Sequence, residues 1–585
     1  MYPGKPGLVI NVGVTGHRNI NDVEKASLTM ICRGILIEIY KNIEEIHKEA
    51  HDLYSKEPYK LQLISSIAEG FDRIAAAVSL EFGYELQCPL PFSRDEYLQD
   101  FETDESVMEF KSLLSRANSV YEINLGRDSL EKTYLNAGSV MLEHTDILLT
   151  FWDGKPSKGP GGTGDIVELA REKGIPVIQI DRSMQVECEG ASLWEEKVKE
   201  VMMEILYPFN DVSKYNFLPT IYFNEDVSKA GHAGLYNYVL NLLTPPKVEH
   251  ELISLKKYKA DDYEIDDGIK GYYSHFLYEA DELAKYYSNY YRSAGIFKAV
   301  IPMLANIGLA IGFYWRWGEN TNLVNVFGFL SQAFFLYWLV RSLGDKNEKK
   351  RWHQKFIDYR ILAECLRYQA YLAPFGLTLG GIEIPAYNKN DTVSWINWYL
   401  RGITRGISLP NMKIDNNVLN GAKELFKREV LTEQFIYHNE KSQILNFAGR
   451  KLKKLGIIMF ATGAIITLVR VLVHFICQID PNLIWFPDSK HKIIKIPTFF
   501  NMLSLLLPAF GSTIQAIGTQ AGFEKLSSQF GFMSEQLKRI YNEDDTQKKW
   551  TFLRMRKWIS SVVGLMINEV TDWRVFVKGK VIQRQ

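Results

Sequence analysis

The chain has 585 residues, of which 68 are lysine or arginine, 69 are aspartate or glutamate and 46% are hydrophobic. This length exceeds what one hydrophobic core can hold, so several domains are expected. The balanced charge excludes a strongly basic nucleic-acid binder, and no direct nucleic-acid partner is expected. Five cysteines without CxxC or metal-ligand spacing exclude a disulfide scaffold and predict a reducing compartment. The start, MYPGKPG, lacks a basic segment followed by an apolar one, so no cleaved signal peptide is expected.

The first 185 residues alternate between short apolar runs and helix-like segments. The runs read as strands and cover 8–14, 61–67, 84–90, 119–125, 146–152 and 175–180. Near-continuous apolar strands separated by helices predict an α/β fold with a doubly wound parallel sheet. Ligands of such sheets lie at the carboxyl ends of the strands, where the strand order reverses.

Glycines, acids and arginines follow these predicted strands. Glycine lets a backbone approach an anion, arginine binds phosphate in a fork, and carboxylates accept from ribose hydroxyls. The helix that follows the segment GPGGTGD offers its N-terminus to a phosphate. The candidate ligand-binding residues are Gly13, Thr15, Gly16, His17, Arg18, Glu69, Gly70, Asp72, Arg73, Pro91, Arg94, Asp153, Gly161, Gly162, Thr163 and Glu168.

Two common nucleotide motifs are missing from the chain, the GxxxxGK[ST] phosphate loop and the GxGxxG dinucleotide fingerprint. Instead GVTGHR, AEGFDRIAAAVSLEFG, PLPFSRDEYLQDF, WDGK and GGTGDIVELAREKGIPVI resemble the SLOG family of Rossmann-like domains, related to LOG and DprA proteins. The resemblance implies that residues 15–18 line the phosphate end of a nucleotide. It places Glu69 and Asp72 near the ribose and has residues 161–163 cradle a phosphate.

The same family includes phosphoribohydrolases that cleave nucleoside monophosphates and sensors that bind nucleotide-derived messengers. The hydrolases resemble PGGxGTxxE, whereas this chain has Thr163 early, then Asp165 and only later Glu168. This departure favours binding without catalysis, so no catalytic residue and no metal are assigned. An enzyme that cleaves the N-glycosidic bond of nucleotides remains the alternative.

Long apolar stretches appear only in the second half of the chain. Four of them approach the ~20 residues that cross a bilayer: 296–315, 323–340, 455–477 and 496–517. Lysines and arginines after the second and before the third predict a multi-pass protein of the inner (plasma) membrane with both termini cytoplasmic. The alternative is that these stretches are core helices of a soluble protein. Arg470 and His474 share one face of the third stretch, where they line a pore or extend toward the membrane surface.

The helical segments beside these stretches carry a second resemblance. ADELAKYYSNYYR, YRILAECLR and NEVTDWR are similar to SLATT domains, two-span modules found beside nucleotide sensors in bacterial defence systems. The domains expected are therefore a SLOG-like domain, its extension, a first two-span module, a cytoplasmic connector and a second two-span module, over 1–185, 186–265, 266–372, 373–445 and 446–585.

Three functions follow from these features. The favoured one is a membrane effector of anti-phage defence, in which the SLOG domain binds a cyclic nucleotide or ADP-ribose-type messenger and triggers a pore or channel. The resemblances imply a homo-oligomer, linked to a nucleotide-synthesising or TIR-type enzyme, whose only small-molecule partner is that messenger. The others are the tethered hydrolase and a transporter with a regulatory domain.

Overall fold

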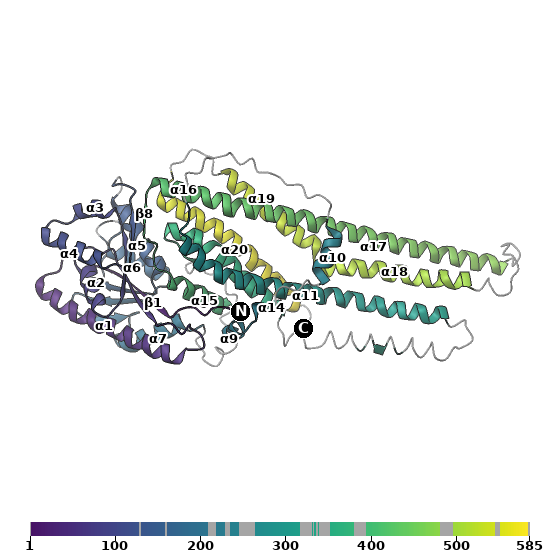
Figure 1. Ribbon diagram of the computed structural model, residues 1–585, viewed down its shortest axis with the longest axis horizontal. Coiled ribbons are helices and arrows are strands. Elements are labelled where there is room, and N and C mark those ends of the chain that lie inside the picture. The colour runs from purple at the N-terminus through teal and green to yellow at the C-terminus, as the bar shows by residue number, and fades with distance from the viewer. Residues whose placement is uncertain are drawn as a thin grey trace.

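A sheet with its covering helices forms one end of the protein, and long helices extend away from it (Figure 1). The computed structural model describes residues 2–127, 130–157, 159, 161–208, 218–228, 235–244, 264–315, 330, 333–334, 337, 352–379, 393–479, 495–543 and 550–582.

The described chain forms one eight-stranded sheet in the order β7-β6-β5-β1-β2-β3-β4-β8. All neighbours are parallel except β7, which is antiparallel to β6. The predicted parallel α/β sheet is thus confirmed, and each of the six predicted strands is present. The strands are β1 (Val9–Gly16), β2 (Lys60–Ile64), β3 (Glu85–Leu90), β4 (Ser119–Ile123), β5 (Ile147–Phe151), β6 (Val177–Ile180), β7 (Val186–Cys188) and β8 (Met412–Ile414).

Helices cover both faces of this sheet. The chain moves outward from β1 to β4 and then returns to β5 on the other side of β1. Because parallel crossovers are right-handed, this reversal puts the later helices on the opposite face. One face carries α1 (Asp22–Glu49), α2 (Phe71–Glu81) and α4 (Asp104–Ser115), with α7 (Trp194–Leu206) packed on α1, and the other carries α5 (Leu130–His144) and α6 (Thr163–Glu172).

Two strands of the sheet come from outside residues 1–185. Strand β7 follows directly, whereas β8 belongs to the predicted connector and pairs with β4 in the register Tyr121↔Met412. The Tyr121 hydroxyl also donates to the Pro374 carbonyl at 2.8 Å. The connector therefore contributes a strand to the sheet.

One hydrophobic cluster runs from the sheet into the helical part. Trp398 illustrates the contact, because its Nε1 donates to the Leu206 carbonyl at 2.8 Å across the two parts. The helices that share this cluster include α14 (Trp352–Leu372), α15 (Val393–Gly406), α16 (Asn416–Phe426) and α20 (Phe552–Ile582). A movement of either part must therefore repack a common core.

Long helices make up the rest of the described structure (Figure 1). The chain from α16 continues through a π-helical stretch, η5 (Lys427–Thr432), into α17. The elements are α9 (Leu218–Phe223), α10 (Leu235–Leu243), α11 (Asp267–Trp315), α17 (Glu433–Ile479), α18 (Lys495–Ala521) and α19 (Phe523–Glu543).

Two helical stretches, Asn416–Leu472 and Met502–Asn542, are long and apolar enough to cross a membrane. In each, only 11% of the most apolar window is buried, so these windows do not belong to the core of the described structure. Exposed apolar surface of this extent marks contact with lipid or with other protein. Where α17 and α18 cross, a Cβ on Gly463 would lie 2.5 Å from Pro508 Cδ, and such close approach is typical of helix pairs in membranes.

The four predicted spans differ in what the structure describes. The stretches 455–477 and 496–517 fall on α17 and α18, and 296–315 is the second half of α11. The stretch 323–340 lies outside the described residues except for four helical positions. Arg470 is exposed on α17, and the side chain of His474 lies outside the described part.

Candidate functional site

The strand order reverses between β1 and β5, and the loops that follow these two strands are tied together. The Asp153 backbone N–H donates to His17 Nε2 at 3.1 Å, and the same nitrogen lies 3.2 Å from Asp153 Oδ1. Although burial alone raises the pKa of Asp153, the hydrogen bond from the Lys155 N–H and the charge of Lys155 help to lower it overall. A carboxylate and an imidazole therefore stand at the place where α/β sheets bind ligands.

The loop after β2 packs directly against this pair of loops. Gly70 has a φ of 88°, and a Cβ there would lie 2.4 Å from the His17 carbonyl oxygen. Only glycine fits such a close approach with a positive φ. The Phe71 N–H donates to the same carbonyl at 3.2 Å, which fixes the start of α2 beside the end of β1.

Asp72, in the first turn of α2, is the most perturbed carboxyl of this edge. It is 6% exposed and accepts a hydrogen bond from Ser65 Oγ at 3.3 Å. Burial raises its pKa to about 7, against the opposing effects of Arg18, Ser65 and two backbone N–H groups. A carboxyl that is half protonated near neutral pH can both donate to and accept from a ligand hydroxyl.

We expect Asp72→Asn to change how stability depends on pH. Between about pH 4 and 7 the folded chain holds the Asp72 proton more tightly than the unfolded chain, so the free energy of unfolding falls as pH rises. One proton contributes a slope of at most about 1.4 kcal/mol per pH unit. Melting temperatures across this range should show that the wild type loses more stability toward pH 7 than the variant does, so the melting temperature of the variant rises relative to that of the wild type. Because Glu569 titrates in the same window, the difference between the two proteins is the readout, and parallel curves would contradict the prediction.

Arg18 follows His17 and is exposed. Its guanidinium lies 5.2 Å from the ring centre of Tyr134, a residue of α5, and no described carboxylate forms an ion pair with it within 4 Å. The Tyr134 hydroxyl donates to Asp100, which also accepts from Arg127 Nη1 at 2.7 Å. The sequence analysis did not single out Tyr134, Asp100 and Arg127, although Arg127 follows Gly126 at the end of a predicted strand and Asp100 lies in the quoted segment PLPFSRDEYLQDF.

Two other predicted arginines are held by acids. The Arg73 side chain is 2% exposed, donates to the Ser106 carbonyl at 2.9 Å and pairs with Glu109 at 3.1 Å. Arg94 pairs with Glu122 at 2.7 Å. Both guanidiniums therefore bind α4 or β4 in this structure.

The remaining predicted residues lie as follows. Glu69 accepts from Ser106 Oγ, Thr15 is paired with Thr150 across β1 and β5, and Pro91 is buried. A Cβ on Gly13 would meet Thr145 Oγ1 at 2.2 Å, and one on Gly16 would meet Phe71 Cβ at 2.5 Å, so both glycines permit close packing.

The glycine-rich loop after β5 leads into α6. Gly161 has a φ of 82°, and its N–H donates to Asp165 Oδ2 at 2.9 Å. Gly162 caps the helix and Thr163 begins it. Glu168 lies in the second turn and is exposed. The residues that the structure brings together most closely at the reversal point are His17, Asp153, Gly70 and Asp72, with Arg18 following His17.

A second polar site lies among the helices, in a cavity of about 340 Å³ lined by α10, α11, α14, α17, α19 and α20. Glu364 is 4% exposed there. It lies 2.6 Å from Arg360 and 3.3 Å from Arg367, and it accepts from the Tyr368 hydroxyl at 3.0 Å. The two arginines outweigh the effect of burial and lower the pKa of Glu364.

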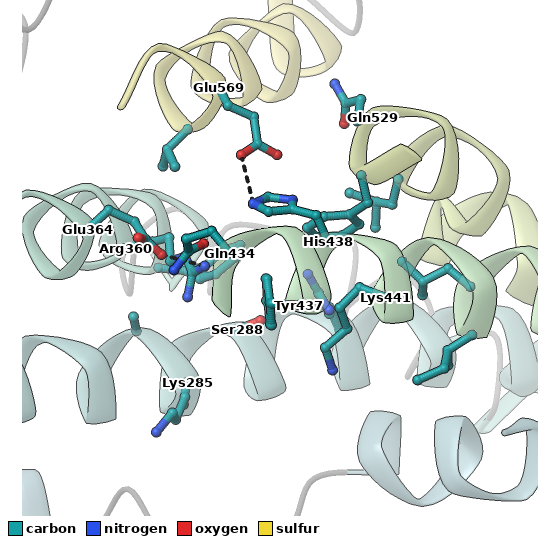
Figure 2. A pocket seen from close by; sticks show the side chains of 18 of the residues that line it. Lys285, Ser288, Arg360, Glu364, Gln434, Tyr437, His438, Lys441, Gln529 and Glu569 are labelled. Carbon is teal, nitrogen blue, oxygen red and sulfur yellow. Dashed lines mark ion pairs between the residues drawn. The ribbon is translucent and has the colours of Figure 1, made fainter. Parts of the chain in front are cut away.

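His438 and Glu569 face each other across the same cavity (Figure 2). His438 Nε2 lies 3.6 Å from Glu569 Oε2. Burial lowers the pKa of His438 to about 4, whereas burial and the charge of Glu364 raise the pKa of Glu569 to about 7. At pH 7 His438 is therefore neutral and Glu569 is about half ionised, beside a charged cluster on α14.

Comparison of the chain with protein-family models, with curated proteins and with solved structures gives no match.

Proposed function

We propose that this chain is a membrane effector of a bacterial anti-phage defence system that senses a nucleotide-derived messenger. The observation that carries the proposal is the polar edge at the reversal point, where Arg18, Asp72 and the linked pair His17 and Asp153 gather. Arginine and backbone N–H groups suit a phosphate, and two carboxyls of different pKa suit ribose hydroxyls. The messenger is a cyclic nucleotide or an ADP-ribose-type molecule.

The response follows from the shared core. A ligand shifts a two-state equilibrium only by its differential affinity for the two states. Because the hydrophobic cluster is continuous from the sheet to α14 and α20, a shift at the sheet repacks the helices that surround the charged cavity. In this proposal the helices α11, α17 and α18 cross the inner membrane, several copies assemble, and the assembly opens a path for ions or solutes.

A two-step experiment tests the proposal. The full chain in detergent is screened by thermal shift against cyclic dinucleotides, cyclic oligonucleotides, NAD, ADP-ribose and cyclic ADP-ribose, since a ligand of the folded state raises the melting temperature. The full chain is needed because β8 completes the sheet. Any ligand found is then added to liposomes that hold the protein and a dye. Binding without release of dye or ions would reject the effector, and no binding from this panel would reject the messenger class.

One observation favours the enzyme as a second candidate. A buried carboxyl with a pKa of about 7, such as Asp72, has the property that a general acid needs near neutral pH. Chromatography of nucleotides incubated with the full chain decides between the two. Release of free base by the wild type, lost in Asp72→Asn, would support an N-glycosidase.

A further inference from the structure

A second cavity, of about 560 Å³, lies in the α/β region. It is at the amino ends of the strands, whereas the candidate nucleotide site is at their carboxyl ends. It is lined by Asn11 of β1, by residues that end α5, by the turn after α6 and by Arg405 of α15. These residues surround the amino ends of β1, β5 and β6. The cavity thus joins the sheet to a helix of the connector.

Arg405 is the central feature of this cavity. It is 4% exposed, and its Nε lies 2.8 Å from each carboxylate oxygen of Asp146. Both terminal nitrogens, Nη1 and Nη2, are buried and have no hydrogen-bond acceptor in the described structure. Buried guanidinium N–H groups without acceptors are costly, so each of these two nitrogens needs an acceptor from a bound ion or from water.

Two more buried polar atoms of the cavity are without partners in the same part of the structure, Asn11 Oδ1 and His144 Nε2. The orientation of the Asn11 amide is fixed, because its Nδ2 donates to the His144 carbonyl at 2.8 Å. Its free atom is therefore an acceptor and needs a donor. Burial lowers the pKa of His144 to about 4, so this imidazole is neutral and adds no charge.

Charge in the cavity favours an anion. The lining holds four cations, Arg171, Lys173, Arg401 and Arg405, and three carboxylates, Glu143, Asp146 and Glu172. Two of these carboxylates are already neutralised, Asp146 by Arg405 and Glu143 by Lys173 at 2.9 Å. Arg171 bonds to Gln179 at 3.4 Å and lies over the Trp152 ring, so the positive charge that a small anion meets here comes from Arg405 and Arg401.

We propose that this cavity binds hydrogen phosphate. Two phosphate oxygens accept from Arg405 Nη1 and Nη2, and the phosphate hydroxyl donates to Asn11 Oδ1. Sulfate has the same size and charge but carries no proton near neutral pH, so it leaves Asn11 without a donor. The bound ion bridges α15 to β1 and adds to the contacts that already join the connector to the sheet, such as the Arg405–Asp146 pair. This site is independent of the proposed messenger site.

Isothermal titration of the full chain in detergent tests the proposal, in phosphate-free buffer at about pH 7.5. Sodium phosphate is expected to bind, and sodium sulfate at least roughly tenfold more weakly. Arg405→Lys keeps a cation beside Asp146 but removes the fork, and it should weaken phosphate binding at least roughly tenfold. Asn11→Leu should lower phosphate affinity to that of sulfate. Glycerol 3-phosphate, largely unprotonated at this pH, should bind as weakly as sulfate.

Two control variants assign the binding to this cavity. Arg556→Lys alters another buried arginine, 4% exposed and bonded to Ser139 and Gly376 outside the cavity, and should leave phosphate binding unchanged. Arg33→Ala, which alters an exposed arginine of α1 paired with Glu81, should also bind phosphate normally. Water alone fills the cavity if phosphate gives no heat, and that result overturns the proposal. Equal affinity for phosphate and sulfate in the wild type, a measurement that needs no variant, also overturns it, and tight binding of glycerol 3-phosphate overturns the assignment of the free ion.

Discussion

Arg18→Ala is expected to abolish the response to the messenger while the protein still inserts into liposomes. Arg18 is exposed, lies 5.2 Å from the Tyr134 ring and follows the linked loops of β1 and β5. Loss of charge-assisted hydrogen bonds to a phosphate weakens binding by about 1.5–3 kcal/mol, which is roughly 10- to 100-fold in affinity. Titration of the ligand found in the thermal-shift screen, followed by dye release, measures both effects.

The matched control for this variant is Arg33→Ala. Arg33 is an exposed arginine of the same α/β region, but it lies on α1 and pairs with Glu81. Its loss should leave ligand affinity and dye release unchanged. Normal activation of Arg18→Ala would remove this arginine from the site. An equal defect in both variants would mean that surface charge, and not a contact with the ligand, controls the response.

The parallel sheet could be predicted from the sequence because its strands are local signals. Each of the first six strands is an apolar run bounded by turn residues, as in 147–151 or 61–64. Strand β8 could not be predicted, since three residues, Met412–Ile414, carry no periodicity and pair with β4 only through the tertiary fold. The shared core could not be predicted for the same reason, because no local sequence pattern shows that the connector packs on the sheet.

From the sequence, the candidate site could be predicted only for residues whose place is set by the end of a strand. His17 and Asp153 meet because β1 and β5 are neighbours, which follows from the rule for doubly wound sheets. Whether an arginine is held by an acid does not follow from that rule. Arg94 pairs with Glu122, 28 residues away, and Arg405 pairs with Asp146, 259 residues away. Which carboxylate pairs with each arginine depends on how the helices pack on the sheet.

Glu364→Gln, in the charged cavity among the helices, is expected to lower the free energy of unfolding strongly. The substitution keeps the size of the side chain but leaves Arg360 and Arg367 without the carboxylate at 2.6 and 3.3 Å. Removing one partner of a buried ion pair costs about 3–5 kcal/mol, and here Asp281, 4.0 Å from Arg360 and 3.7 Å from Arg367, still compensates part of the arginine charge. Because the Arg360 and Arg367 side chains are 28% and 34% exposed, water offsets part of this cost. We expect a loss of about 2–3 kcal/mol in the free energy of unfolding.

The pH dependence identifies the carboxylate as the cause. The pKa of Glu364 is lower in the folded chain than its usual value of 4.5, so its contribution is complete above that value and is lost as pH falls below it. Thermal denaturation of the full chain in detergent should show a large gap between wild type and Glu364→Gln at pH 7, and a smaller one in acid. Glu282→Gln serves as control, because Glu282 pairs with Lys285, whose side chain is 58% exposed, and should cost little. A gap that does not change with pH would mean that packing, and not charge, makes Glu364 important to the helices around the cavity.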